Sequence, residues 1–195
     1  MLIINAIVFF ITANLYRLAG LFGEYRIPVC VASGILFLVG NIRPSLRDKK
    51  IPSRRLRVCM QGSYLLILFC VSAAASMFYL LLEIGRLFSG EAGIWLLHLL
   101  NVFLVEAAVF WNGIIRVYLT SKQLAVKWRL LGVICGFIPV ANLVVLYHII
   151  RITGYEAKLE GEKLLLDESR KEQRICATKY PILLVHGVFF RDFKY

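Results

Sequence analysis

Apolar residues along this chain are gathered into long blocks, and most charged residues lie in the intervals between them. A helix needs about 20 mostly apolar residues to cross roughly 30 Å of hydrocarbon. The blocks approach that length and lack the strict alternation of barrel strands. The pattern therefore predicts an all-α transmembrane helical bundle of about five helices in residues 1–150. The expected helices cover residues 2–16, 27–42, 58–82, 94–119 and 130–150.

The first two blocks are the shortest of the five. They can form a tight pair around the connection that holds Arg17, Glu24 and Arg26, or they can tilt into a thinner region. A cleaved signal peptide is the competing interpretation of the first block. No Lys or Arg precedes its apolar run and no clear small-residue cleavage site follows it, so an uncleaved helix is favoured.

Composition agrees with a membrane protein, because 59% of the 195 residues are hydrophobic, 18% are charged and the mean hydropathy is +0.74. Ordinary globular domains are roughly 45–50% apolar. The net charge of +11 belongs mainly to the membrane part, since residues 151–195 hold nine Lys/Arg against seven Asp/Glu. The five cysteines form no zinc-binding spacing, and neither a metal nor a cofactor is expected.

The loops between the blocks predict the orientation of the bundle. Residues 43–57 carry seven Lys/Arg against one acid, and residues 120–129 add three more Lys/Arg. The positive-inside rule places both loops in the cytoplasm, and a fifth crossing would then leave the C-terminal tail outside. Residues 43–57 would also attract anionic lipid headgroups. Nucleic acid is not an expected partner, because no aromatic residue is interleaved with these charges.

The fourth block is interrupted by polar residues. At about 100° per residue, four of them share an arc of roughly 60°, and the fifth, Glu106, lies on the other side. A carboxylate facing lipid would cost several kcal/mol, so Glu106 should face the bundle and find a partner or stay protonated. Hydrogen bonds to neighbouring helices, for example to Gln61, are favoured over a proton or ion path. The four residues that share the arc are His98, Asn101, Asn112 and Arg116.

The fifth block contains Pro139, preceded by Gly132 and Gly136. A proline inside a helix removes a backbone hydrogen bond and kinks the helix, whereas small residues allow close helix contact. A kinked packing helix is therefore expected at residues 130–150. After it, residues 151–179 are dense in charge and predict a solvated charged linker or helix.

Residues 180–195 differ from the charged segment before them. Pro181 can begin a strand, residues 182–185 form a short apolar run, and His186 with Gly187 marks a break after it. These residues predict one buried strand followed by a special loop.

The segment YPILLVHGVFFRDF resembles the first conserved block of bacterial triacylglycerol lipases of the alpha/beta-hydrolase superfamily. The resemblance implies that the backbone N–H of Val188 points at the developing oxyanion. It also implies that Gly187 lets the chain approach the acyl carbon, and that His186 is a structural loop residue and not the general base. Donors of this kind stabilise a tetrahedral intermediate by roughly 3 kcal/mol.

The 195 residues contain no G-x-S-x-G nucleophile elbow to complete such a site. We therefore expect the membrane anchor portion of a lipase-like hydrolase, with residues 180–195 as the start of a truncated alpha/beta-hydrolase domain. This chain alone would be inactive, and only a full-length form would take a lipid or ester substrate. The alternative is a small non-enzymatic multi-pass membrane protein with a structural or partner-binding role.

Overall fold

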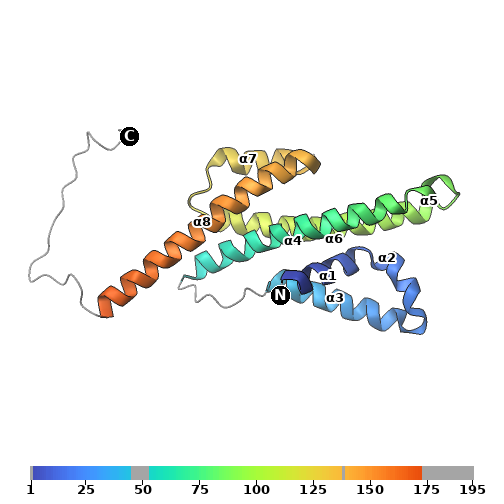
Figure 1. Cartoon of the computed structure of the whole chain (residues 1–195), viewed down its shortest axis with the longest axis horizontal. Coiled ribbons are helices and arrows are strands. Elements are labelled where there is room, and N and C mark those ends of the chain that lie inside the picture. Colours follow the sequence, from blue (N-terminus) through green and yellow to red (C-terminus); the bar gives the residue numbers. More distant parts are fainter. Residues whose placement is uncertain (1, 45–52, 138, 173–195) are drawn as a thin grey trace, which may run out of the picture.

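The structure is a computed structural model that describes residues 2–44, 53–137 and 139–172, and all regular elements in these ranges are helical (Figure 1). The predicted strand in residues 180–195 lies outside the described residues. The elements, including two 3-10 segments, are α1 (Leu2–Ala13), α2 (Leu15–Leu18), η1 (Ala19–Tyr25), α3 (Arg26–Ile42), α4 (Arg54–Leu82), α5 (Gly85–Phe88), α6 (Ala92–Thr120), α7 (Val126–Ile134), η2 (Cys135–Phe137) and α8 (Pro139–Glu172).

Helices α4 and α6 form the central antiparallel pair of the bundle (Figure 1). Each has 29 residues and is about 44 Å long. Gly62 and Gly113 meet where the two helices cross, and a Cβ atom at Gly62 would lie 2.9 Å from the carbonyl oxygen of Gly113. Near the far end, the indole N–H of Trp95 donates to the carbonyl oxygen of Leu80 at 3.3 Å. Small residues therefore permit the close approach that polar contacts then fix.

The first two apolar blocks fold back on each other as α1 and α3. The hydroxyls of Thr12 and Ser33 are 2.7 Å apart, and the rings of Phe9 and Phe37 lie edge to face with centroids 5.2 Å apart. The chain reverses through α2 and η1, where Gly23 adopts φ 50° and ψ −119°. Glycine tolerates this conformation because it has no Cβ. The sequence left open a tight pair or two tilted helices, and the structure shows the tight pair.

Three helical stretches are long and apolar enough to cross a membrane, namely Leu15–Ile42, Arg54–Phe88 and Ala92–Thr120. The first comprises α2, η1 and α3 and therefore includes the break at Gly23. Helix α1 is apolar but has only 12 residues, about 18 Å. The chain is thus a helical membrane protein, but the described residues do not form the five full-length crossing helices that the sequence predicted.

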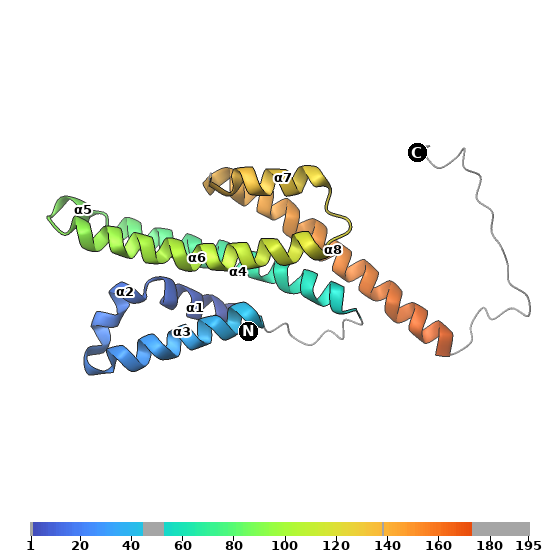
Figure 2. The same ribbon diagram turned by 180° about the vertical axis from the view of Figure 1, so that it is seen from behind.

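The fifth block forms a helical hairpin, which corrects the expectation of one kinked helix over residues 130–150. The rings of Trp128 and His148 stack with centroids 4.7 Å apart. On one continuous helix these residues would be separated by about 30 Å. Both views show α7 beside the first half of α8 (Figures 1 and 2). Pro139 is the first residue of α8 and starts a helix, a position that needs no backbone N–H.

The hairpin reaches only partway along the bundle. A Cβ atom placed on Gly136, near the turn, would lie 3.5 Å from the Phe110 ring. Phe110 precedes the end of α6 at Thr120 by about 15 Å, half the thickness of a hydrocarbon core. Leu146 and Ile149 of α8 are fully buried in the same apolar cluster as Phe110. The hairpin therefore packs against one half of the bundle and returns to the end where it began.

Helix α8 runs without a break from Pro139 to Glu172, across the boundary predicted at residue 150. The charged segment is therefore helical at least to Glu172, one of the two alternatives that the sequence left open. The hydroxyls of Thr153 and Ser63 are 2.6 Å apart, which joins α8 to α4. The charged half of α8 thus leaves the bundle at the end where α4 begins (Figure 1).

Candidate functional site

Glu156 is the carboxylate with the most complete set of partners among the described residues. Its side chain is fully buried and accepts a hydrogen bond from Arg55 Nη1 at 2.6 Å and one from the Ser121 hydroxyl at 2.5 Å. The backbone N–H groups of Lys122 and Gln123 donate to it at 3.0 and 3.3 Å. One side chain of α8 therefore binds the start of α4 and the loop that follows α6.

Arg55 completes this cluster. Its second terminal nitrogen, Nη2, forms an ion pair with Glu160, one turn beyond Glu156, and Nη1 also donates to the carbonyl oxygen of Thr120 at 2.6 Å. We call Arg55, Ser121, Glu156 and Glu160 the α8 clamp. Because the clamp joins α4, α6 and α8, it fixes where the charged arm leaves the bundle.

The Glu156 carboxylate is held ionised by its neighbours. Burial alone would raise its pKa, but the hydrogen bonds from the Lys122 N–H, the Ser121 hydroxyl and the Arg55 guanidinium outweigh burial and lower the pKa below its ordinary value. The clamp is therefore a charged contact at neutral pH.

Arg116 organises a second polar cluster at the same end of the bundle, where α3 ends. Its Nη2 donates to the carbonyl oxygen of Ile42 at 2.7 Å, and its Nη1 donates to Gln61 Oε1 at 3.1 Å. Its Nε donates to Asn112 Oδ1 at 2.9 Å, and the Asn112 amide donates to Asn41 of α3. The arginine therefore covers carbonyl groups that the end of α3 leaves unpaired. Gln61 is the partner that the sequence suggested for this helix.

His98 belongs to a third cluster near the opposite end of α4. Its imidazole is fully buried, with Nε2 3.0 Å from Asn14 Oδ1 and Nδ1 3.4 Å from Glu83 Oε2. The Asn14 amide donates to the Ser76 hydroxyl at 2.9 Å, and Arg17 Nε lies 3.3 Å from the Glu83 carboxylate. Residues of α2, α4 and α6, together with Asn14 before α2 and Glu83 after α4, therefore meet around one imidazole.

Asn101 and Glu106 have separate partners. The Asn101 amide donates to the carbonyl oxygen of Ala13 at 2.5 Å, where α1 ends. Glu106 Oε2 accepts a hydrogen bond from the Ser72 hydroxyl at 2.9 Å, whereas Glu106 Oε1 is buried and has no hydrogen-bond partner among the described residues. Within the same part of the chain, no hydrogen bond links Glu106 to His98, which lies about 12 Å away along α6. The contacts therefore favour helix packing over a proton path.

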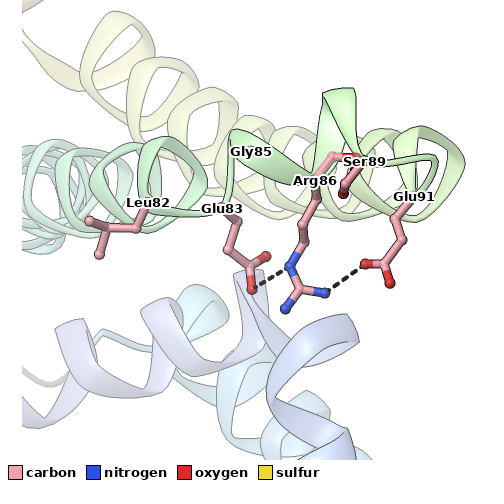
Figure 3. A pocket seen from close by; sticks show the side chains of 6 residues that line it. All are labelled: Leu82, Glu83, Gly85, Arg86, Ser89 and Glu91. Atoms are coloured by element: carbon pink, nitrogen blue, oxygen red, sulfur yellow. Dashed lines mark hydrogen bonds and ion pairs between the residues drawn. The ribbon is translucent and has the colours of Figure 1, made fainter.

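An open depression of about 510 Å³ lies at the turn between α4 and α6 (Figure 3). Arg86 bridges its two acids, with Nη1 2.8 Å from Glu91 and Nε 3.7 Å from Glu83. Among residues 2–44, 53–137 and 139–172, no three His, Cys, Asp or Glu side chains are grouped to hold a metal ion. The depression is thus lined by paired charges, and its described lining residues do not form a metal-binding or catalytic group. Its lining consists of Leu82, Glu83, Gly85, Arg86, Ser89 and Glu91.

The hydrolase-like residues His186, Gly187 and Val188 lie outside the described residues, so the geometry of the expected oxyanion loop is not described. No protein-family model, no curated protein and no solved structure matches this chain.

The α8 clamp was missed by sequence reasoning, which treated Glu156 and Glu160 as part of a solvated spacer. One pattern could have identified the contact. Thr153, Ala157 and Gly161 are small residues at intervals of four, and all three are buried. Small residues at this spacing mark a helix face that approaches another helix closely. Glu156 and Glu160 directly precede two of them and share this contact.

Proposed function

We propose that residues 2–172 form a multi-pass membrane anchor that holds the C-terminal part of the chain at the cytoplasmic surface. The observation that carries this proposal is the α8 clamp, which joins the charged arm to the end of the bundle where α4 begins. The loop of residues 43–57, which ends at this point, is the most basic segment of the chain. The positive-inside rule assigns such a loop to the cytoplasm.

This proposal places the C-terminal tail on the cytoplasmic side, whereas the sequence led us to expect an extracytoplasmic tail. That expectation depended on a fifth crossing over residues 130–150, whereas α7 and α8 form a hairpin that returns to the end of the bundle where it began. The clamp contacts from Glu156 to Arg55 and to Ser121 support one common side for the basic loop, residues 120–129 and the arm.

The anchor role is tested by fusing a soluble reporter after Glu172 and washing the membranes with alkaline carbonate. The reporter should stay in the membrane pellet, because the apolar helices cross the bilayer and are not removed with peripheral proteins. A matched fusion that begins at Gly154 lacks the apolar helices and should be released. Release of both fusions would contradict the anchor role.

We further propose that the anchored activity is ester hydrolysis of the lipase type. This proposal is supported by the resemblance of residues 180–193 to lipases, in which Gly187 and Val188 would supply part of the oxyanion hole and His186 would keep the loop in shape. Membranes that contain only these 195 residues should hydrolyse no more ester than membranes without them, because the sequence has no nucleophile elbow.

The gene supplies a second test of the lipase proposal. Its coding sequence should continue past the Tyr195 codon and encode a G-x-S-x-G elbow in the same frame. Absence of the elbow, or ester hydrolysis by the 195 residues alone, would contradict the lipase proposal and leave the anchor intact.

A non-enzymatic role is the second candidate, and the packing of α6 favours it. Hydrogen bonds to residues outside α6 are made by all five polar residues of this helix, so these residues need no transport or catalytic role. They are His98, Asn101, Glu106, Asn112 and Arg116. Deletion of residues 180–195 distinguishes the two candidates. A structural protein would keep its cellular phenotype without them, whereas a lipase-type protein would lose it.

A further inference from the structure

The mouth of the α7–α8 hairpin carries cations and aromatic rings on one exposed face. Arg151, Tyr155 and Lys158 follow one another at intervals of four and three residues, so they share one side of α8. All three are exposed, and the Arg151 guanidinium carbon lies 5.9 Å from the centre of the Tyr155 ring. At about 100° per residue, these three side chains are roughly 100° to 160° away from Glu156, which points into the clamp.

Helix α7 extends the same face. Trp128 stacks on His148, which precedes Arg151 by about one turn of α8. The ammonium of the exposed Lys127 lies 5.8 Å from the centre of a Trp128 ring. We call Lys127, Trp128, Arg151, Tyr155 and Lys158 the hairpin face.

The charge of this region has one sign. The sequence has no Asp or Glu between Glu106 and Glu156. Glu156 itself is buried and paired with Arg55. Among the described residues, no carboxylate lies within ion-pair distance of Lys127, Arg151 or Lys158, although Glu162 follows one turn after Lys158. The cations of the hairpin face therefore remain available for an external anion.

Apolar side chains lie next to the hairpin face, on the part of the hairpin nearer the bilayer centre. They are between 49% and 58% exposed, as expected for side chains that contact lipid tails. Tyrosine and tryptophan prefer the boundary between tails and headgroups. From the turn of the hairpin to its mouth, the arrangement thus presents tail contacts first and then a zone in which aromatic rings and cations alternate. The apolar residues are Leu130, Leu143 and Val144.

We propose that the hairpin face binds the headgroups of anionic phospholipids in the leaflet that the hairpin enters. Its cations attract the phosphate and the net negative charge, while the aromatic rings hold the hairpin mouth at headgroup depth. This binding surface is distinct from residues 43–57, and its role does not depend on the resemblance to lipases.

The test measures lipid retention by the purified 195-residue chain with native mass spectrometry. The protein is prepared in mixed micelles that contain phosphatidylglycerol and phosphatidylcholine in equal amounts. Wild-type protein should retain phosphatidylglycerol preferentially. The triple variant Lys127→Gln, Arg151→Gln, Lys158→Gln should lose this preference by about fivefold for each cation removed at low ionic strength.

A matched control removes the same charge further from the membrane. The triple variant Lys163→Gln, Arg170→Gln, Lys171→Gln changes three exposed cations on the outer part of α8 and should keep the wild-type preference. An equal loss in both triple variants would show that net charge alone attracts the lipid and would overturn the proposal. Retention of the preference by the hairpin-face variant would overturn it as well.

A stability measurement keeps the test independent of folding. Each variant must unfold in phosphatidylcholine micelles at the wild-type temperature. If the triple variant does not, the single variants Lys127→Gln and Arg151→Gln replace it, each with an expected loss of about fivefold.

The wild-type preference must also fall as salt is added, because salt screens the exposed charges. A salt-independent preference would contradict headgroup recognition by these cations.

Discussion

At the scale of single residues, Glu156 shows how a charged side chain joins several helices at one end of a bundle. It combines an ion pair with Arg55, a hydroxyl donor and two backbone donors, all of which favour the ionised form. A buried charge without such partners would destabilise the fold. The cluster is therefore sensitive to the loss of charge on one carboxylate.

Replacing Glu156 with glutamine should destabilise the protein by about 2 to 3 kcal/mol, because the charge-assisted hydrogen bonds weaken and one amide N–H2 group replaces an acceptor oxygen. The free energy of unfolding in detergent micelles provides the measurement. Glu162→Gln is the matched control on an exposed position of the same helix. An equal effect of the two substitutions would show that the clamp contributes nothing specific.

The stability of the clamp should also depend on pH. The pKa of Glu156 is lower in the folded protein than in the unfolded chain, so its contribution is fully present above the unfolded value of about 4.3 and is lost as the pH falls towards the folded value. Unfolding followed between neutral and acidic pH should therefore show a smaller stability loss for Glu156→Gln than for wild type. Parallel pH profiles of the two proteins would contradict the ionised clamp.

At the scale of elements, the close crossing of α4 and α6 depends on Gly62. A Cβ there would approach the backbone oxygen of Gly113 to 2.9 Å, and backbone cannot move aside as a flexible side chain can. Gly62→Ala should therefore destabilise the bundle by about 1 to 3 kcal/mol. Gly154→Ala is the control, since a Cβ at Gly154 meets nothing within 4 Å. It should leave stability unchanged or raise it slightly in the same unfolding experiment.

The sequence predicted which residues are helical better than it predicted how the helices are arranged. Apolar block length was sufficient to identify α4 and α6, and the polar face of α6 correctly indicated contacts with Gln61 and other neighbours. The α7–α8 hairpin could not be identified, because glycines followed by Pro139 fit a kinked helix as well as a turn. Hydrophobicity is the same in both cases, whereas the contact of Trp128 with His148 distinguishes them.

At the scale of the whole molecule, the hairpin and the α8 clamp together determine at which end of the bundle the charged arm of α8 leaves it. The hairpin returns α8 to the end of the bundle where it entered, and Arg55 and Ser121 hold the charged arm there. In the proposed orientation, this one turn reverses the side of the membrane assigned to the charged arm of α8.

The most direct test of the proposed orientation uses cysteine labelling to compare the membrane side of three positions. The variants Ser89→Cys, Lys122→Cys and Ser169→Cys would each be made after replacing the five native cysteines with alanine. Ser89 lies at the turn beside the depression, Lys122 lies beside the clamp, and Ser169 lies on the arm. In intact cells, a membrane-impermeant maleimide should label the Ser89→Cys variant and leave the other two unlabelled until the membrane is opened. If intact cells were labelled at Ser169→Cys as well as at Ser89→Cys, with Lys122→Cys unlabelled, the arm would lie on the opposite side from the clamp. That result would contradict the proposed orientation.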